Sequence, residues 1–107
     1  MSVITQNGSL LTLINVFTVV PEKQQAVVDL LVRATEQDVK ILAGFISANI
    51  HKSDDGLRVV NYAQWENKEA FENFLRNPRA NAHFKQAEEI AEKIDFHTYT
   101  VEHVFAK

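Results

Sequence analysis

The stretch from Leu10 to Val20 constrains the fold of this 107-residue chain more than any other part of the sequence. In an extended backbone, one side of it would carry Leu11, Leu13, Asn15, Phe17 and Val19, and the other Thr12, Ile14, Val16 and Thr18. A strand that is apolar on both sides belongs in the middle of a sheet whose two faces are both covered. We therefore expect residues 10–20 to form a central strand.

Periodicity, together with turn and cap residues, marks the remaining elements. Pro21 suits a first helical position, Gly44 a helix end, and the Asp-Gly pair within Ser53–Gly56 a hairpin turn. Asn67 and Asn77 are both suited to cap a helix. These signals predict a helix at 21–42, strands at 45–52 and 57–66, a helix after Asn67, a second helical segment at 79–94 and a last strand at 95–105.

This order, β-α-β-β-α-β with a tight central hairpin, predicts an α+β, ferredoxin-like fold with an antiparallel four-stranded sheet. Right-handed crossovers place the strand at 57–66 between the first two strands, and both helical regions on one face of the sheet. We expect one domain at 10–107, preceded by a flexible segment at 1–9.

The sheet face without helices is also expected to be apolar. Under strict alternation it carries Ile14, Val16, Ile46, Ala48, Ile50, Val60 and Tyr62. A monomer would leave this surface in water, which soluble proteins avoid. We therefore predict a homodimer in which two sheets face each other.

The composition excludes several classes of function. Fourteen acidic against eleven basic residues give a formal net charge of −3, which argues against nucleic acid and anionic membranes as partners. The chain has no cysteine, so thiolate catalysis and cysteine-ligated zinc are excluded. No apolar run approaches the ~20 residues that span a bilayer, and residues 1–9 do not resemble a signal peptide. A cytoplasmic protein is the default expectation.

Three polar side chains indicate a ligand site. Asn61 and Trp65 are four residues apart on one predicted strand and so share a face. Asn15, on the neighbouring strand, interrupts an apolar row and could lie close to Asn61. Together they offer amide donors and acceptors and an indole N–H, which can orient a flat ligand that carries carbonyl groups. Alternatively, the asparagines pair with each other or with loop backbone, and the tryptophan is part of the core.

The sequence resembles a known family at this point. Val-Val-Asn-Tyr-Ala-Gln-Trp-Glu-Asn-Lys-Glu-Ala-Phe at 59–71, Phe-Leu-Arg-Asn-Pro at 74–78 and Ala-His-Phe at 82–84 are similar to the antibiotic biosynthesis monooxygenase (ABM) domain. The resemblance extends from Leu10 to Phe105, and the tryptophan-to-helix segment is its most specific part.

The resemblance implies a dimeric α+β barrel that oxidises a small or aromatic (anthrone- or quinol-like) substrate with O2 and no cofactor. It implies that Asn15, Asn61 and Trp65 favour the phenolate or enolate form of the substrate, whose carbanion then reduces O2. Asparagine does not titrate, so the proton must pass to water or to a histidine. His51, on the expected pocket face, and His83, near a position where the family often has histidine, are the candidate bases.

We expect further substrate contacts from Phe17, Phe45, Asn49, His51, Phe74 and Phe84. No metal site is predicted: His97 and His103 share a strand face with Tyr99, but no carboxylate lies on that face of the strand.

Two alternatives remain at this stage. One is haem degradation, which related enzymes perform with a strand asparagine, a helix tryptophan and a histidine ligand. Asn15 would match, but Phe74 occupies the tryptophan position and the histidine position falls at or beside His83, on Phe84. The other is a dimeric small-molecule-binding module without catalysis, because a fold does not determine a function.

Overall fold

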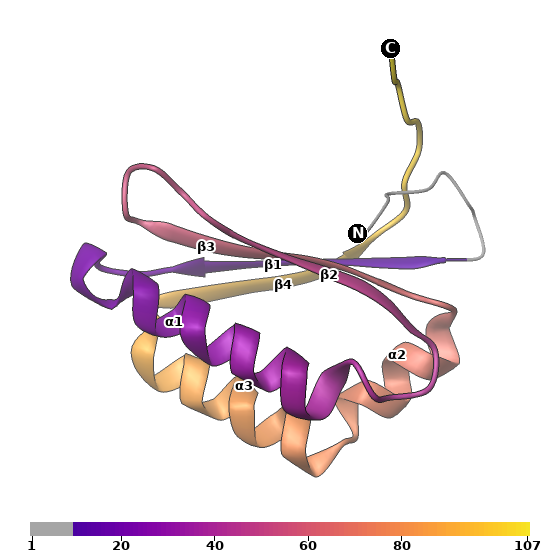
Figure 1. Cartoon of the computed structure of the whole chain (residues 1–107), viewed down its shortest axis with the longest axis horizontal. Coiled ribbons are helices and arrows are strands. Elements are labelled where there is room, and N and C mark those ends of the chain that lie inside the picture. The colour runs from indigo at the N-terminus through magenta and orange to yellow at the C-terminus, as the bar shows by residue number, and fades with distance from the viewer. Residues whose placement is uncertain (1–9) are drawn as a thin grey trace.

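The computed structural model describes residues 10–107 (Figure 1). Its elements are β1 Leu11–Thr18, α1 Pro21–Ala34, a π-helical segment η1 Thr35–Val39, β2 Phe45–Lys52, β3 Arg58–Trp65, α2 Lys68–Leu75, α3 Pro78–Ile90 and β4 Lys93–Tyr99. The segment predicted to be flexible at 1–9 lies outside the described residues. None of the helices described is both long enough and apolar enough to cross a membrane.

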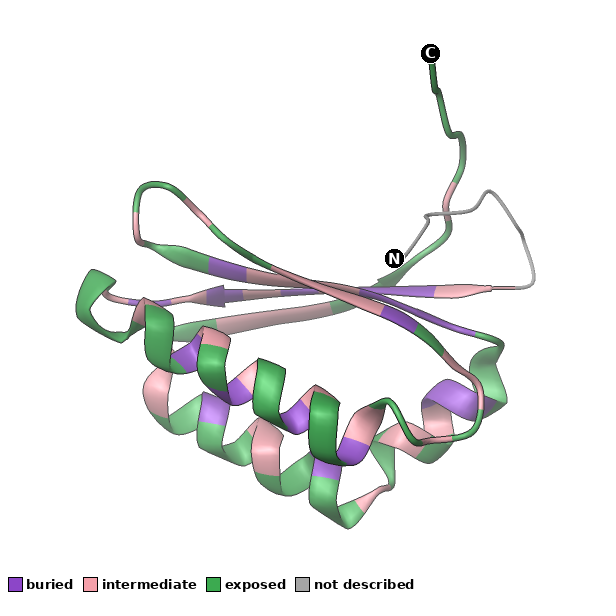
Figure 2. Ribbon diagram, viewed as in Figure 1, coloured by how far each residue is buried: buried purple, intermediate pink, exposed green. Residues whose placement is uncertain are grey.

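The sheet has the strand order β2-β3-β1-β4 and is antiparallel throughout. The prediction of a ferredoxin-like sheet with β1 inside it and β3 between β1 and β2 is therefore confirmed. All three α-helices cover one face of the sheet (Figure 1). Their buried residues lie along the helix sides that face the strands (Figure 2).

Helix starts follow the predicted caps. Asn67 Oδ1 accepts a hydrogen bond from Ala70 N at 2.9 Å, and Asn77 Oδ1 accepts two from the first turn of α3. Pro21 and Pro78 occupy first helical turns, where a missing N–H costs nothing. These local signals set where the helices begin.

Several predicted ends are wrong. The first helix does not continue to residue 42, because the chain widens into the π-helical segment after Ala34 and leaves the helix at Lys40. Gly44 is not its cap. Gly44 has φ +83°, and a Cβ there would lie 2.3 Å from Ala70 Cβ, so glycine serves a tight turn beside α2.

The last helix and the last strand are both displaced from the prediction. α3 ends at Ile90, and Ile94 pairs with Phe17 in the sheet instead of extending the helix. β4 ends at Tyr99 instead of residue 105. Its only neighbour in the described sheet is β1, and the last pair between the two strands is Thr12 with Tyr99.

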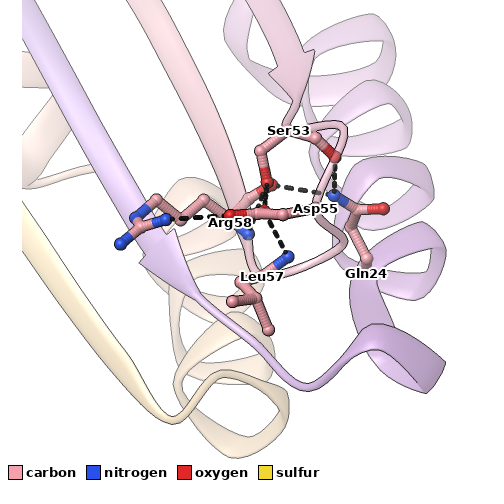
Figure 3. Close-up of polar contacts among 5 residues, drawn as sticks. All are labelled: Gln24, Ser53, Asp55, Leu57 and Arg58. Carbon is pink, nitrogen blue, oxygen red and sulfur yellow. Dashed lines mark hydrogen bonds and ion pairs between the residues drawn. The ribbon is translucent and has the colours of Figure 1, made fainter.

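The β2–β3 hairpin closes one end of the sheet (Figure 3). Asp55 Oδ1 accepts hydrogen bonds from Ser53 Oγ at 2.6 Å and from Leu57 N at 2.9 Å. Gln24 Nε2, from α1, donates to the carbonyl oxygens of Ser53 and Arg58 at 2.9 and 3.0 Å. The hairpin is thus tied both to itself and to the start of α1.

The layer between sheet and helices contains two apolar clusters. The closed end, next to this hairpin, is formed by Phe17, Val19, Val27, Leu30, Val59 and Ala87. The cavity end, next to the start of α2, is formed by Leu13, Ala63, Trp65, Ala70 and Phe71.

A β-bulge changes which residues of β2 face the helices. Phe45 pairs with Trp65 but Ser47 pairs with Gln64, so Ile46 is one extra residue on β2. An extra residue moves the side chains that follow to the opposite face. The strict alternation expected from the sequence is therefore wrong beyond this point.

The bulge turns Ala48 and Ile50 toward the helices, where they pack against the two clusters. Asn49 and His51 consequently point to the opposite, outer face. There Asn49 is opposite Tyr62 and donates from Nδ2 to the Tyr62 carbonyl oxygen at 3.2 Å.

Candidate active site

A cavity of about 60 Å³ lies between the sheet and the helices, where the two apolar clusters meet. Eight of the predicted site residues line it: Asn15, Phe17, Phe45, Asn61, Trp65, Phe74, His83 and Phe84. Asn49 and His51 do not, because the bulge places them on the outer face. The expectation that these two residues share the pocket face is therefore wrong.

The strand register brings the two asparagines together. Asn15 on β1 lies directly opposite Asn61 on β3, as predicted, and both face the helices. Trp65 follows on the same side of β3 at the strand end and is 1% exposed. Its ring stacks on Phe74 at a centroid distance of 4.9 Å and meets Phe45 edge-on at 5.6 Å. The polar groups are thus held on rigid strands inside an aromatic wall.

Four polar atoms in this wall are buried without a hydrogen-bond partner in the described part of the chain: Asn15 Oδ1, Asn61 Oδ1, Trp65 Nε1 and His83 Nδ1. The alternative in which the two asparagines satisfy each other is therefore wrong. A buried polar atom left unpaired costs about 1–3 kcal/mol, and most such atoms in folded proteins are paired. These four atoms belong to residues that line one cavity.

His83 reaches the cavity from α3, and its other ring nitrogen is occupied. Nε2 lies 2.6 Å from Oδ2 of Asp38, which is a residue of the π-helical segment η1. Asp38 is only 8% exposed, and its second oxygen lies 3.6 Å from Nη1 of the exposed Arg79. Asp38 is not among the site residues predicted from the sequence. The signal was an acidic residue four positions after Ala34, on the apolar side of the first helix.

An open groove adjoins the cavity at α2, α3 and β4. It has a volume of about 310 Å³ and is lined by Phe74, Leu75, Ala80, Asn81, Phe84 and Phe96. Phe74, Ala80, Phe84 and Phe96 also line the cavity. Phe84 and Phe96, which line both spaces, meet edge to face at 5.7 Å.

The two volumes limit what can bind. The cavity alone is too small for an aromatic ring, because a cavity of about 150 Å³ is known to hold benzene. Binding sites for small molecules usually measure about 300–1,000 Å³. Cavity and groove together have that size, and a ligand that filled both would place one edge against the unpaired polar atoms.

The histidines considered for a metal site are not gathered into one. His97 contacts Tyr99 edge-on at 6.5 Å. Within residues 10–107, no group of three or more His, Cys, Asp or Glu side chains is placed to hold a metal ion.

Comparison with known proteins agrees with this geometry. Residues 10–89 match the family model for antibiotic biosynthesis monooxygenase. The chain belongs to the ABM family. Its matched region contains β1, β2 and β3 and most of α3, and therefore every cavity residue discussed above except Phe96 on β4.

Relatives of this ABM domain include characterised and solved proteins. Tetracenomycin-F1 monooxygenase of Streptomyces glaucescens is 45% identical over 84 residues, which cover 78% of this chain and 75% of that protein. A monooxygenase from the gene ActVA-Orf6 of Streptomyces coelicolor, solved in complex with nanaomycin D, superposes with a TM-score of 0.79 at 25% identity over 92% of each chain. SnoaB of Streptomyces nogalater, described as a cofactor-independent oxygenase, superposes with a TM-score of 0.73 at 19% identity over 92% of this chain and 99% of that chain.

Proposed function

We propose that this ABM domain is a cofactor-independent monooxygenase that oxidises an aromatic, anthrone- or quinol-like substrate with O2. One observation carries the proposal: four unpaired buried polar atoms surround a small cavity whose remaining wall is aromatic and aliphatic. The 45% identical relative, named for the oxygenation of tetracenomycin F1, supports this class of substrate.

Recognition would use both parts of the wall. A flat ring system in the groove would lie against Phe74, Phe84 and Phe96, which offer apolar area with little loss of side-chain freedom. Its oxygen-bearing edge would enter the cavity, where the Trp65 indole N–H and the amides of Asn15 and Asn61 can bind a hydroxyl or carbonyl group. The ligand would then satisfy the atoms that the protein leaves unpaired.

The N–H groups of this wall, on Trp65 Nε1 and on the side-chain Nδ2 of Asn15 and Asn61, can stabilise charge as the reaction proceeds, whereas the unpaired Oδ1 atoms can only accept hydrogen bonds from a substrate hydroxyl. Loss of a proton from the substrate gives an enolate or phenolate, and donors fixed around its oxygen lower the free energy of that anion. The carbanion form gives electrons to O2, a C–O bond forms, and the resulting peroxide takes up a proton. Loss of water, with departure of the second C–H proton, converts the CH2 group to C=O.

Atoms and electrons balance in this sequence without an external reductant. One oxygen atom of O2 becomes the new carbonyl and the other becomes water, and the substrate supplies all the electrons. The protein need only bind, orient and move protons, so no cofactor is required. The fold relative SnoaB, described as a cofactor-independent oxygenase, supports the view that this architecture can house such chemistry.

The haem alternative is less well supported by the site. His83 lines a cavity of about 60 Å³, far less than a porphyrin occupies, and its Nε2 is already held by Asp38. Addition of haem followed by a reductant tests this alternative directly. A Soret band that then decays would favour haem degradation and contradict the cofactor-free proposal.

Oxygen uptake with an anthrone such as dithranol tests the proposed reaction. Asn61→Ala should lower kcat by about 10²–10³-fold, the usual cost of removing one preorganised donor to a developing anion. The matched control is Asn73→Ala, an exposed asparagine on α2, which should leave kcat unchanged. Equal rates for Asn61→Ala and the wild type would refute the charge-stabilising role. Thermal stabilisation by the anthrone without oxygen uptake would indicate the binding module instead.

We also propose that the protein acts as a homodimer through its outer sheet face. Half-buried Ile14, Val16, Val60 and Tyr62 lie at the centre of that face, and no described helix covers it (Figure 1). Sedimentation should show a dimer, and Val16→Lys should give monomers because it places a charge among these side chains. Val32→Lys, on the exposed side of α1, is the control. A wild-type monomer would contradict this proposal.

A further inference from the structure

We infer that Asp38 is a positioning residue that fixes the tautomer of His83 and makes Nδ1 the proton acceptor of the site. This inference rests on the proposed function, since it assigns the base for the same reaction. It starts from the 2.6 Å contact between His83 Nε2 and Asp38 Oδ2, made by two residues that are 45 positions apart in the chain.

The backbone explains how a carboxylate comes to lie here. After Ala34 the helix widens, and Lys40 N donates to Thr35 O, five residues back. Single turns of π-helix are frequently found at functional sites. Asp38 stays on the buried side of this segment, beside α3, whereas Glu36 in the same segment is exposed and pairs with Lys40.

The contact determines which nitrogen of His83 carries the hydrogen. An ionised carboxylate can only accept a hydrogen bond, so Nε2 must donate to Asp38. In the neutral ring, Nδ1 then holds a lone pair. Nδ1 is buried, has no partner in the described chain and belongs to a side chain that lines the cavity with Asn15 and Asn61. A free acceptor therefore faces the place where the substrate loses its proton.

No other residue of the cavity wall can take this proton. Among the described residues that line the cavity, His83 is the only one with a titratable side chain. The asparagines and Trp65 can donate hydrogen bonds to an anion, but they do not accept a proton near neutral pH. A proton that moved to Nδ1 would leave an imidazolium whose Nε2–H bond to Asp38 becomes charge-assisted and stronger.

The proton balance closes within the site. The substrate proton moves to Nδ1 as the enolate forms, and the imidazolium returns it to the peroxide anion after O2 has added. The ring is then neutral again when water leaves. Imidazole suits both steps because it exchanges protons in the neutral range.

The charges around the pair are few. Arg79, on α3, lies 3.6 Å from Asp38 Oδ1 and is 80% exposed, so solvent weakens its effect. Glu36 and Lys40 pair with each other on the outer side of η1. From the sheet, the cavity residues that face His83 are uncharged. Asp38 is thus the carboxylate that acts directly on the ring.

The alternative is that the pair only ties η1 to α3. The decisive variant is Asp38→Asn, which keeps the shape of the side chain but can donate to the ring as well as accept from it. The matched control is Glu36→Gln, the same chemical change two residues away on the exposed side. Asp38→Glu, which keeps the carboxylate, is the rescue variant.

Two measurements follow. ¹⁵N NMR of the wild type at alkaline pH, without substrate, should show His83 with hydrogen on Nε2, and Asp38→Asn should lose this preference. With dithranol, Asp38→Asn should lower kcat by about 10²-fold, with little change in KM, and change how kcat depends on pH. Asp38→Glu should recover part of the rate, and Glu36→Gln should retain all of it.

The outcomes separate the two proposals. Asp38→Asn that unfolds more easily but keeps the wild-type kcat and pH profile would show a structural tie and overturn the inference. Hydrogen on Nδ1 in the wild type would overturn it even in an active enzyme. A wild-type protein that has the expected tautomer but takes up no oxygen would instead overturn the proposed function. The role of His83 as the base of that reaction would then fail too.

Discussion

The two ends of the layer between sheet and helices differ in how they treat polar groups. At the closed end the core is entirely apolar, and the polar groups of the hairpin above it bond to one another and to Gln24 (Figure 3). At the cavity end, the wall contains four buried polar atoms that the described chain leaves unpaired. Both ends are built on the same strands, β1 and β3, so the difference lies in the side chains and not in the fold.

The difference indicates that the closed end mainly stabilises the fold and the cavity end mainly serves the reaction. Unpaired buried groups and empty space reduce stability, and proteins keep them where function requires them. The closed end, with no such groups in its core, can offset this cost. Changes at the closed end should therefore alter stability more than turnover, and changes at the cavity end should alter turnover more than stability.

The largest effect on stability is expected from Leu30→Ala. Leu30 is 3% exposed at the closed end and does not line the cavity. Loss of its side chain should lower the free energy of unfolding by about 2–5 kcal/mol, from lost burial and the void left behind. Urea denaturation gives this value, and kcat measured well below the melting temperature should stay close to that of the wild type.

Val32→Ala is the control for this change, because Val32 is 45% exposed on the same helix. It should alter stability by no more than about 0.5 kcal/mol. Loss of turnover in a fully folded Leu30→Ala variant would show that the two ends are not independent.

The sequence predicted the features that neighbouring residues determine better than those that distant residues determine, at both ends of the molecule. Caps and turns at Asn67, Asn77 and Ser53–Gly56 depend on neighbouring residues, so the sequence is sufficient to place them. The opposition of Asn15 and Asn61 followed from the order of the strands. The position of every helix and strand was thus predicted, although some ends were not.

The errors arose where distant parts of the chain decide the outcome. Nothing in the local pattern marks Ile46 as an extra residue, so Asn49 and His51 were assigned to the wrong face. The role of Gly44 depends on the close approach of Ala70 from another element. Asp38 was missed because its partner, His83, lies 45 residues away in the sequence.

A smaller effect on stability, of opposite sign, is expected from Asn15→Leu at the cavity end. Asn15 is 5% exposed and its Oδ1 is unpaired, so an apolar side chain of similar size should raise the free energy of unfolding by about 1–3 kcal/mol. Turnover should fall by about 10²–10³-fold, because one group that binds the developing anion is lost. Urea denaturation and oxygen uptake measure the two changes.

Asn49→Leu is the matched control on the other side of the same sheet. Asn49 donates a hydrogen bond to the Tyr62 carbonyl oxygen, so its replacement should give no gain in stability and little change in turnover. Should Asn15→Leu also fail to stabilise the protein, the unpaired amide of Asn15 would not be a cost to stability.

The smallest effect is expected from Asp55→Ala in the exposed hairpin at the closed end. The pKa of Asp55 lies below its ordinary value of 3.8, mainly because Ser53 Oγ donates a hydrogen bond to its carboxylate and also because Leu57 N does. A carboxyl group whose pKa is lowered by folding stabilises the protein above its unfolded pKa, and this contribution is lost as the pH falls through the folded pKa.

The urea midpoint of the wild type should therefore exceed that of Asp55→Ala at neutral pH, and the two should converge as the pH falls below about 4. Asp54 is the adjacent acid and makes no such hydrogen bonds in the described chain. The urea midpoints of Asp54→Ala and the wild type should therefore not converge as the pH falls. A difference between wild type and Asp55→Ala that stayed constant with pH would mean that the shape of the side chain, and not its charge, holds the turn. Because the hairpin residues 53–58 do not line the cavity, turnover at neutral pH should be the same in all three proteins. A change in turnover would show that stability at the closed end and geometry at the cavity end are coupled through β3.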